Sequence, residues 1–282
     1  MYNQYYNFRD KPFCISPDPD FLFLTQKHKK ALMLMRYALA TQAGFAVVTG
    51  EVGSGKTTLI SKVISQDSPN LTIGVVNNTQ CTDALELMQW ILFAFDLDFS
   101  AKSHVELYDT FTKFLIKEYT EGRNVAIIID EAQHLGMKLL EQVRLLSNLN
   151  SGKHTALQFL IVGQPELRDQ LAKPEFQQFT QRVIIDYHLN ALNFNETIGY
   201  IRHRLLTVGG DPSLFCEEGM HLIWEHSGGV PRLINVLCDL SLVYGYSAQL
   251  KDKIYPCIIK EVLHDKGMEI PTLKQVQKES SM

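Results

Sequence analysis

The chain has 282 residues, 45% of them hydrophobic and 21% charged, which allows one large or two modest domains with a buried core and excludes a largely disordered chain. Its formal net charge of −4 excludes a global basic field that would draw it to nucleic acid or to an anionic bilayer. The five cysteines are scattered without a C-x-x-C pair, and no apolar run approaches the roughly 18 residues that span a bilayer, so we expect a cytoplasmic protein with reduced thiols.

The chain begins with an N-terminal segment, residues 1–30, and continues with an α/β pattern over residues 31–190. The segment ends in the basic cluster KHKK, which we interpret as a solvated face at the start of a helix rather than as a binding site. Strand-like runs then occupy 45–49, 71–76, 125–130, 157–163 and 183–189, and amphipathic helical stretches occupy 83–95, 104–120, 137–149 and 166–179. This alternation predicts a parallel sheet with helices on both faces.

After about residue 190 the strand signal stops and only helical patterns remain. They fill 194–208, 215–226, 231–248 and 257–265. The change predicts a small all-α domain over residues 191–266, which follows the α/β core without a linker rich in Pro, Gly or Ser. The last stretch, residues 267–282, is polar, and we expect it to be frayed.

The stretch GEVGSGKTT fits the pattern G-x-x-x-x-G-K-[ST] and lies between a strand-like run and a helical stretch, the order that a phosphate-binding loop requires. In this pattern backbone N–H groups wrap the phosphates, the lysine reaches the β- and γ-phosphates, and the hydroxyl residue holds Mg²⁺. The predicted nucleotide-binding residues are Gly50, Glu51, Val52, Gly53, Ser54, Gly55, Lys56, Thr57 and Thr58. We assign a catalytic role to Lys56 and a metal-binding role to Thr57. A glycine turn with a solvated lysine is the alternative.

The stretch VAIIIDEAQHL places two carboxylates, Asp130 and Glu131, at the end of an apolar strand-like run, where open α/β sheets collect their ligands. We predict that Asp130 holds Mg²⁺ through its water shell, and that Glu131 orients or deprotonates the water that attacks the γ-phosphate. The two residues also fit a turn before the next helix, and both interpretations can hold at once. A glutamate here favours hydrolysis over phosphoryl transfer to another acceptor.

Three more polar residues are candidates, each with a simpler alternative. Gln164 follows a strand-like run, where it either contacts the attacking water or γ-phosphate or merely starts a loop. Arg182 lies between a helix and a strand, and either reaches a neighbouring subunit's γ-phosphate or forms a surface ion pair. Arg232 follows Pro231 in the first turn of a predicted helix, and either contacts the nucleotide or faces solvent.

Together these blocks resemble AAA+ ATPases of the ExeA/general secretion pathway protein A type, and also the ATPases associated with exosortase and exopolysaccharide loci. The resemblance covers about residues 5 to 250. Its motifs, in the order in which they occur, are GEVGSGKTTL, IIDEAQHL, LIVGQPELRDQL, QRVIIDYHLNAL and SGGVPRLINVLCD. The resemblance assigns Lys56 and Thr57 to Walker A, Asp130 and Glu131 to Walker B, Gln164 to sensor 1, Arg182 to the arginine finger and Arg232 to sensor 2.

The resemblance also implies an architecture and partners. It implies a five-stranded core and a helical lid with ATP between them, and a homo-oligomer, expected to be a ring, in which a neighbour completes each site. Phe13 would either close over the adenine or belong to the core. Members of the ExeA type typically continue into a transmembrane helix and a peptidoglycan-binding region, whereas this chain stops, so we expect a membrane-protein partner and a peripheral location at the inner membrane.

The leading hypothesis is therefore an Mg²⁺-dependent, oligomeric ATPase that drives assembly or remodelling of a secretion or cell-envelope complex. One alternative is an AAA+ regulator of the transposition or initiation type that binds DNA in an ATP-dependent way, although the acidic balance of charge argues against nucleic acid as a partner. Another is a nucleotide switch that does not hydrolyse ATP.

Overall fold

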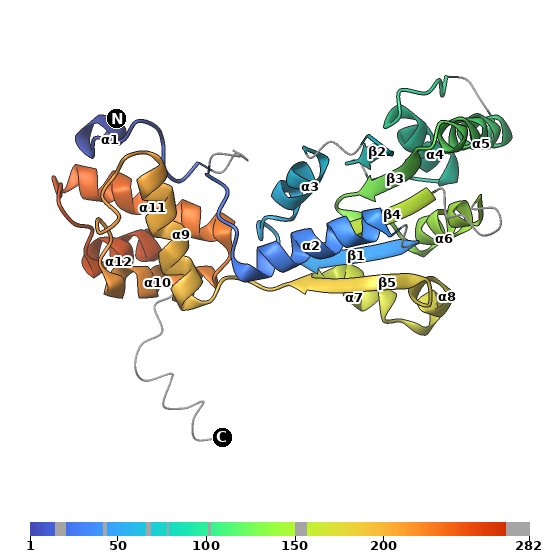
Figure 1. Ribbon diagram of the computed structural model, residues 1–282. Coiled ribbons are helices and arrows are strands. Elements are labelled where there is room, and N and C mark those ends of the chain that lie inside the picture. Colours follow the sequence, from blue (N-terminus) through green and yellow to red (C-terminus); the bar gives the residue numbers. More distant parts are fainter. Residues whose placement is uncertain are drawn as a thin grey trace. The chain divides into compact units, whose positions relative to one another are not determined.

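The computed structural model describes residues 1–14, 21–41, 44–65, 69–77, 79–100, 103–149 and 157–268 of the chain, which form two compact units (Figure 1). The α/β unit comprises Gln26–Glu51 and Gly55–Asn190. The helical unit comprises Met1–Thr25, Val52–Ser54 and the chain from Ala191 onward. Most of the polar stretch expected at 267–282 lies outside the described residues.

Five parallel strands form the sheet of the α/β unit. They are β1 (Phe45–Gly50), β2 (Leu71–Val76), β3 (Asn124–Ile129), β4 (Leu157–Gly163) and β5 (Val183–Leu189), in the order β2-β3-β4-β1-β5. Every residue of β1 and β4 is buried, as expected for central strands of a parallel sheet that is covered on both faces. The predicted parallel sheet is therefore confirmed, and each strand matches its predicted run to within one residue at either end.

Different helices cover the two faces of this sheet (Figure 1). One layer consists of α4 (Ala84–Phe93), α5 (His104–Thr120), α6 (Met137–Leu146), α7 (Pro165–Leu171) and α8 (Gln177–Thr180). These helices share a buried cluster with Phe45, Val47 and Phe159, and the ring of Phe45 stacks on that of Phe159 at 5.0 Å. Helices α2 (Gln26–Ala40) and α3 (Lys56–Ile64) contact each other and β1, whose alternate residues Ala46 and Val48 face the opposite side from Phe45.

The helical stretch expected over 166–179 is interrupted in the structure. Helix α7 ends at Leu171, a 3-10 turn spans Pro174–Phe176, and α8 begins at Gln177. The cause is Pro174, which has no N–H to donate to the preceding turn and whose ring clashes with a continuing helix. Helix α6 likewise ends at Leu146 and is followed by a 3-10 turn at Ser147–Leu149.

Four helices that the sequence predicted make up most of the helical unit. They are α9 (Phe194–Thr207), α10 (Glu217–Ser227), α11 (Pro231–Ser247) and α12 (Pro256–Asp265). Within the described ranges, no helix of either unit combines the length and the apolar character that crossing a membrane requires. The longest helices there, α5 and α11, have 17 residues each.

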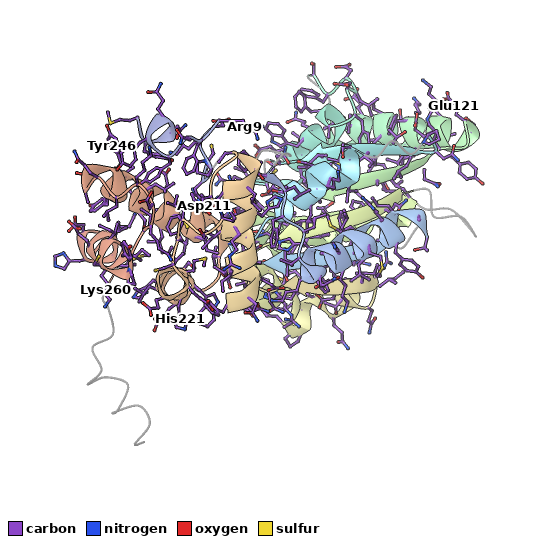
Figure 2. The ribbon with its side chains drawn as sticks, turned by 60° about the vertical axis from the view of Figure 1, so that its left-hand side comes forward. Arg9, Glu121, Asp211, His221, Tyr246 and Lys260 are labelled. Carbon is purple, nitrogen blue, oxygen red and sulfur yellow. The ribbon has the colours of Figure 1, made fainter. Side chains whose placement is uncertain are left out.

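The N-terminal segment contributes aromatic side chains to the core of the helical unit, which the sequence pattern did not indicate. Helix α1 (Tyr2–Tyr5) packs on α11, and the ring of Tyr5 lies 5.1 Å from that of Tyr246, which is labelled in Figure 2. Phe13 is only 1% exposed and contacts Phe215 edge to face at 6.0 Å. Of the two expectations for Phe13, the structure favours a place in the core.

Two adjacent glycines before α11, Gly228 and Gly229, provide a test of how closely the backbone of Leu192 approaches this turn. Both have positive φ, but a Cβ on Gly229 would lie 1.9 Å from the carbonyl oxygen of Leu192, whereas one on Gly228 would meet nothing within 4 Å. We expect Gly229→Ala to destabilise the helical unit by about 3 kcal/mol or more, because backbone strain and an unrelievable clash add. Gly228→Ala carries the strain alone, and we expect a cost of about 1 kcal/mol.

Thermal unfolding of the two variants, followed by circular dichroism, measures this difference. Equal unfolding temperatures would contradict the close approach of Leu192 to Gly229.

Candidate functional site

The predicted phosphate-binding loop lies between β1 and α3. Strand β1 is buried as far as Gly50, and α3 begins at Lys56. Gly53 and Gly55 have φ angles of 80° and 98°, a region in which other residues are strained, so the backbone explains both glycines. The first N–H groups of α3 have no intrahelical acceptor, and Gly55, its N-cap residue, has no side chain to accept from them. These N–H groups therefore suit an anion.

Lys56 is held inside this loop and is only 5% exposed. Its Nζ donates hydrogen bonds to the carbonyl oxygens of Gly50 at 2.7 Å and Glu51 at 2.9 Å. Burial lowers the pKa of Lys56, and the nearby carboxylates of Glu131 and Asp130 offset part of this effect. Neutral carbonyls are weaker partners for an ammonium group than phosphate oxygens, so a bound phosphate would compete for this side chain.

The carboxylate of Asp130, 5% exposed at the end of β3, contacts the start of α3. Thr57 Oγ1 donates a hydrogen bond to Asp130 Oδ2 at 2.9 Å, and the backbone N–H of Glu131 donates to Oδ1 at 2.9 Å. Burial raises the pKa of Asp130, and these two hydrogen bonds oppose the rise.

A hydroxyl beside a carboxylate is the kind of oxygen donor pair that Mg²⁺ prefers. The described part of the chain contains no group of three or more His, Cys, Asp or Glu side chains that could hold a metal alone. The pair Thr57 and Asp130 therefore fits Mg²⁺ bound together with substrate phosphates, the usual mode for this ion, better than an all-protein metal site.

Glu131 occupies a strained position directly after Asp130. Its φ of 53° is left-handed, a conformation that non-glycine residues adopt mostly where the surroundings enforce it. Glu131 Oε2 accepts hydrogen bonds from Gln164 Nε2 at 2.8 Å and Gln133 Nε2 at 2.6 Å. Burial acts to raise the pKa of Glu131, but these amide donors together with Lys56 and His134 outweigh it, so the pKa is lowered. The carboxylate thus stays ionised at neutral pH, as a general base must.

The structure therefore brings five predicted residues together at the carboxyl ends of β1, β3 and β4. They are Lys56, Thr57, Asp130, Glu131 and Gln164. In the rest of the loop Ser54 is buried, Thr58 is half-buried, and Glu51 and Val52 are exposed.

Arg182 lies at the other end of the sheet. Val183 of β5 pairs with Phe45, and Leu189 pairs with Gly50, so Arg182 is about 20 Å from the loop along the strands. Its Nη1 donates to Ser147 Oγ at 2.6 Å and Asn148 Oδ1 at 2.8 Å. Arg182 therefore cannot contact a phosphate held by its own loop.

Arg232 is exposed in the first turn of α11, after Pro231, as predicted. It belongs to the helical unit, with which Gly53 is grouped as well. A Cβ added to Gly53 would lie 2.4 Å from the Cβ of Arg232, so this approach requires a glycine at position 53.

Gln133 is a member of the cluster that the sequence pattern did not predict. Its Oε1 accepts a hydrogen bond from the backbone N–H of Gln164 at 3.0 Å, while its Nε2 donates to Glu131. The only signal in the sequence is its place two residues after Glu131, and nothing in that spacing distinguishes it from an exposed loop glutamine.

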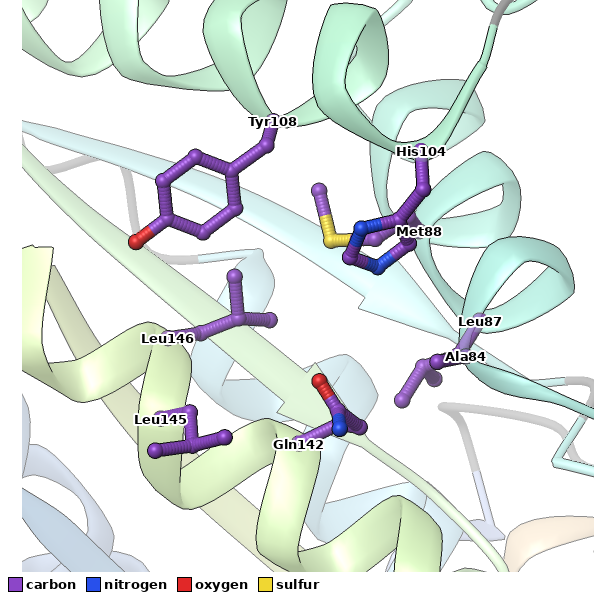
Figure 3. A pocket seen from close by; sticks show the side chains of 8 residues that line it. All are labelled: Ala84, Leu87, Met88, His104, Tyr108, Gln142, Leu145 and Leu146. Carbon is purple, nitrogen blue, oxygen red and sulfur yellow. The ribbon is translucent and has the colours of Figure 1, made fainter.

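A small pocket lies between α4, α5 and α6 (Figure 3). It is lined by Ala84, Leu87, Met88, His104, Tyr108, Gln142, Leu145 and Leu146. None of these is a predicted site residue, and the lining is mostly apolar, so the pocket belongs to the packing of the helix layer rather than to the phosphate site.

Comparison with known sequences identifies relatives. A family model described as an AAA domain matches residues 39–171. The chain is 35% identical over 249 residues to general secretion pathway protein A of Aeromonas hydrophila, covering 88% of this chain and 45% of that protein. It is 30% identical over 130 residues to ATP-dependent target DNA activator B of Escherichia phage Mu, covering 46% of this chain and 39% of that protein. The chain thus spans less than half the length of each relative.

Solved structures also resemble the chain. The ORC2 protein of Aeropyrum pernix in its ADPNP-ADP complexes matches with a TM-score of 0.65 at 17% identity, covering 91% of this chain and 72% of that one. Drosophila ORC bound to DNA matches with a TM-score of 0.67 at 14% identity, covering 93% of this chain and 65% of that one. Identities this low show the fold alone, and with the family match they confirm the predicted P-loop AAA+ fold.

The opposite pKa shifts of the two adjacent carboxylates predict opposite effects on stability. Because the pKa of Asp130 is raised, its contribution to stability is complete below the ordinary Asp pKa of about 3.9 and is lost as pH rises through the raised value. We therefore expect Asp130→Asn to raise the unfolding temperature of the nucleotide-free protein at pH 7, by roughly 2–4 °C, and to have no effect of this kind below about pH 3.9.

The pKa of Glu131 shifts in the opposite direction to that of Asp130. Its pKa is lowered, so its contribution is complete above the ordinary Glu pKa of about 4.3 and is lost as pH falls through the lowered value. Glu131→Gln should then lower the unfolding temperature at pH 7. Thermal unfolding of both variants across pH, with EDTA present, tests the two predictions. Changes of the same sign in the unfolding temperature at pH 7 would contradict the opposite pKa shifts of Asp130 and Glu131.

Proposed function

We propose that this chain, which matches an AAA domain over residues 39–171 and is similar to general secretion pathway protein A over 88% of its own length, binds ATP with Mg²⁺ and hydrolyses it. The observation that carries the proposal is the 2.9 Å hydrogen bond from Thr57 to Asp130, beside the buried ammonium group of Lys56. It joins a phosphate-binding loop to the end of β3, which is the arrangement that Mg²⁺-ATP requires.

Each residue has a defined task in this proposal. Lys56 exchanges the carbonyl oxygens of Gly50 and Glu51 for the β- and γ-phosphates, while Thr57 and Asp130 hold the metal ion. When bound, Mg²⁺ bridges phosphate oxygens and neutralises their charge. Glu131, ionised at neutral pH, accepts a proton from the attacking water, and Gln164 orients Glu131 by its amide hydrogen bond.

We further propose that a second copy of the chain completes the site. Arg182 lies about 20 Å from its own loop along the strands, yet its guanidinium is held by Ser147 and Asn148. An arginine in this place can act only on the nucleotide of a neighbouring subunit, where such a group is worth about 10³- to 10⁵-fold in rate. Catalysis then needs a homo-oligomer, for which we propose a ring. Arg232 remains our proposal for a further nucleotide contact.

Our proposal for the cellular role is based on the name of the relative. General secretion pathway protein A is similar to this chain over 88% of the chain, although the chain spans only 45% of that protein. We propose that hydrolysis drives assembly or remodelling of a secretion or cell-envelope complex. A membrane-protein partner would then keep the protein at the inner membrane.

ATP-dependent DNA binding is the second candidate. The phage Mu relative is an ATP-dependent target DNA activator, and the first turns of α2 carry Lys27, Lys29 and Lys30, with no acidic residue in the first turn. Binding to a DNA duplex that requires ATP and weakens steeply with salt would favour this candidate over the envelope role. Absence of such binding would favour the envelope role.

Two inactive variants should restore each other if the site is shared. We expect specific ATPase activity to rise with protein concentration, and Glu131→Gln and Arg182→Ala each to abolish it, by about 10³-fold or more for Arg182→Ala, while both still bind ATP. In an equal mixture, about a quarter of the interfaces would join an intact Glu131 to an intact Arg182, so activity should return to about that fraction.

Two further variants are the controls. Lys56→Ala should lose ATP binding itself, and Arg202→Ala, which removes an exposed arginine of α9, should behave as wild type. Turnover that is independent of concentration, with no recovery in the mixture, would contradict a shared site. Wild type that binds ATP without hydrolysing it would identify a nucleotide switch instead.

A further inference from the structure

Both polar groups of the Gln133 side-chain amide form hydrogen bonds, and only one orientation of the amide allows this. Nε2 donates to the carboxylate of Glu131 at 2.6 Å, and Oε1 accepts the backbone N–H of Gln164 at 3.0 Å. Turning the amide over would set a carbonyl oxygen against the carboxylate and an NH₂ group against an N–H. Both contacts would be repulsive, so the partners themselves fix which atom is nitrogen and which is oxygen.

The surroundings of Gln133 hold this amide in place. Gln170 Nε2 donates to the backbone oxygen of Gln133 at 3.2 Å. At the end of β4, a Cβ on Gly163 would lie 3.1 Å from Gln133 Oε1 and 2.7 Å from Leu167 Cδ2. The absence of a side chain at position 163 therefore gives the amide the space that it occupies.

We propose that Gln133 is a positioning residue, which orients the Glu131 carboxylate for water activation by holding it between the ends of β3 and β4. The inference rests on the proposed ATP hydrolysis and adds a residue to it. Both amide donors, Gln133 and Gln164, reach the same oxygen, Oε2, so Oε1 receives neither of them. Oε1 is then the atom that takes the proton.

The step to which this orientation contributes balances as follows. The attacking water gives a proton to Oε1 of Glu131 while its oxygen bonds to the γ-phosphorus. The bond from that phosphorus to the β–γ bridging oxygen breaks, and ADP leaves with the electron pair. Gln133 touches neither the water nor the phosphate in this scheme, because both ends of its amide are already engaged.

Loss of the Gln133 amide should therefore slow proton transfer from water to Glu131 without weakening the binding of ATP. Gln133→Met keeps the length of the side chain and removes both hydrogen bonds, together with the 3.2 Å contact between Gln133 Nε2 and His134 Nε2. We expect kcat to fall about 10- to 100-fold, part of the 10²–10⁴ that a positioned base contributes, with KM and ATP affinity unchanged.

A second variant and two controls complete the experiment. Gln133→Glu cannot donate to Glu131 and sets a like charge beside it, so kcat should fall further than in Gln133→Met, again with ATP affinity unchanged. Gln181→Leu, at an exposed glutamine, should leave kcat unchanged. Thermal unfolding verifies that each variant is folded.

One readout does not depend on turnover. In crystal structures of the nucleotide-free protein, the Glu131 carboxylate should occupy one position in the wild type, where Gln133 and Gln164 both donate to Oε2, and should leave that position in Gln133→Met. An unchanged position of the carboxylate, a kcat within twofold of wild type, or a loss confined to KM overturns the positioning role. If the wild type binds ATP but does not turn it over, proposed hydrolysis fails, and the position of the carboxylate alone decides whether Gln133 holds Glu131.

Discussion

The parallel alignment of β1, β3 and β4 is the constraint on which the candidate site depends. In a parallel sheet all carboxyl ends lie at one edge, so the residues that follow each strand meet there regardless of their separation in the chain. The hydrogen bond from Thr57 to Asp130 joins positions 73 residues apart, and that from Gln164 to Glu131 joins positions 33 apart. Complete burial of β1 and β4 places both strands in the centre of the sheet, with helices covering both of their faces.

Two adjacent carboxylates acquire opposite properties at this edge. Asp130 is buried at the end of β3, and desolvation raises its pKa. Glu131 is turned by a left-handed backbone toward amide donors, which lower its pKa in spite of burial. The opposite pKa shifts suit the tasks that we propose for the two carboxylates. A bound cation would compensate the costly charge of Asp130, whereas Glu131 must stay ionised without one.

The same sheet separates Arg182 from the residues it is proposed to assist. Because β5 runs parallel to β1, a residue that precedes β5 lies at the amino edge, opposite the phosphate-binding loop. The hydrogen bonds from Arg182 to Ser147 and Asn148 keep its guanidinium at that edge. Arg182 therefore cannot reach the phosphate-binding loop of its own chain, and the catalytic role that we propose for it requires a second chain.

The sequence by itself determined the five strands, the four helices that follow residue 190 and the loop at 50–58, because their signals are local: apolar runs, helical periodicity and closely spaced glycines. It also indicated Asp130 and Glu131, since strand ends are where ligands gather. It did not indicate Gln133, the division of the helical stretch at Pro174, or the packing of residues 1–14 on the helical unit, although it left open a core position for Phe13. Only the tertiary structure decided these, because an amide between two strand ends and a ring such as Phe13 against Phe215 are contacts between distant segments, and no local pattern records them.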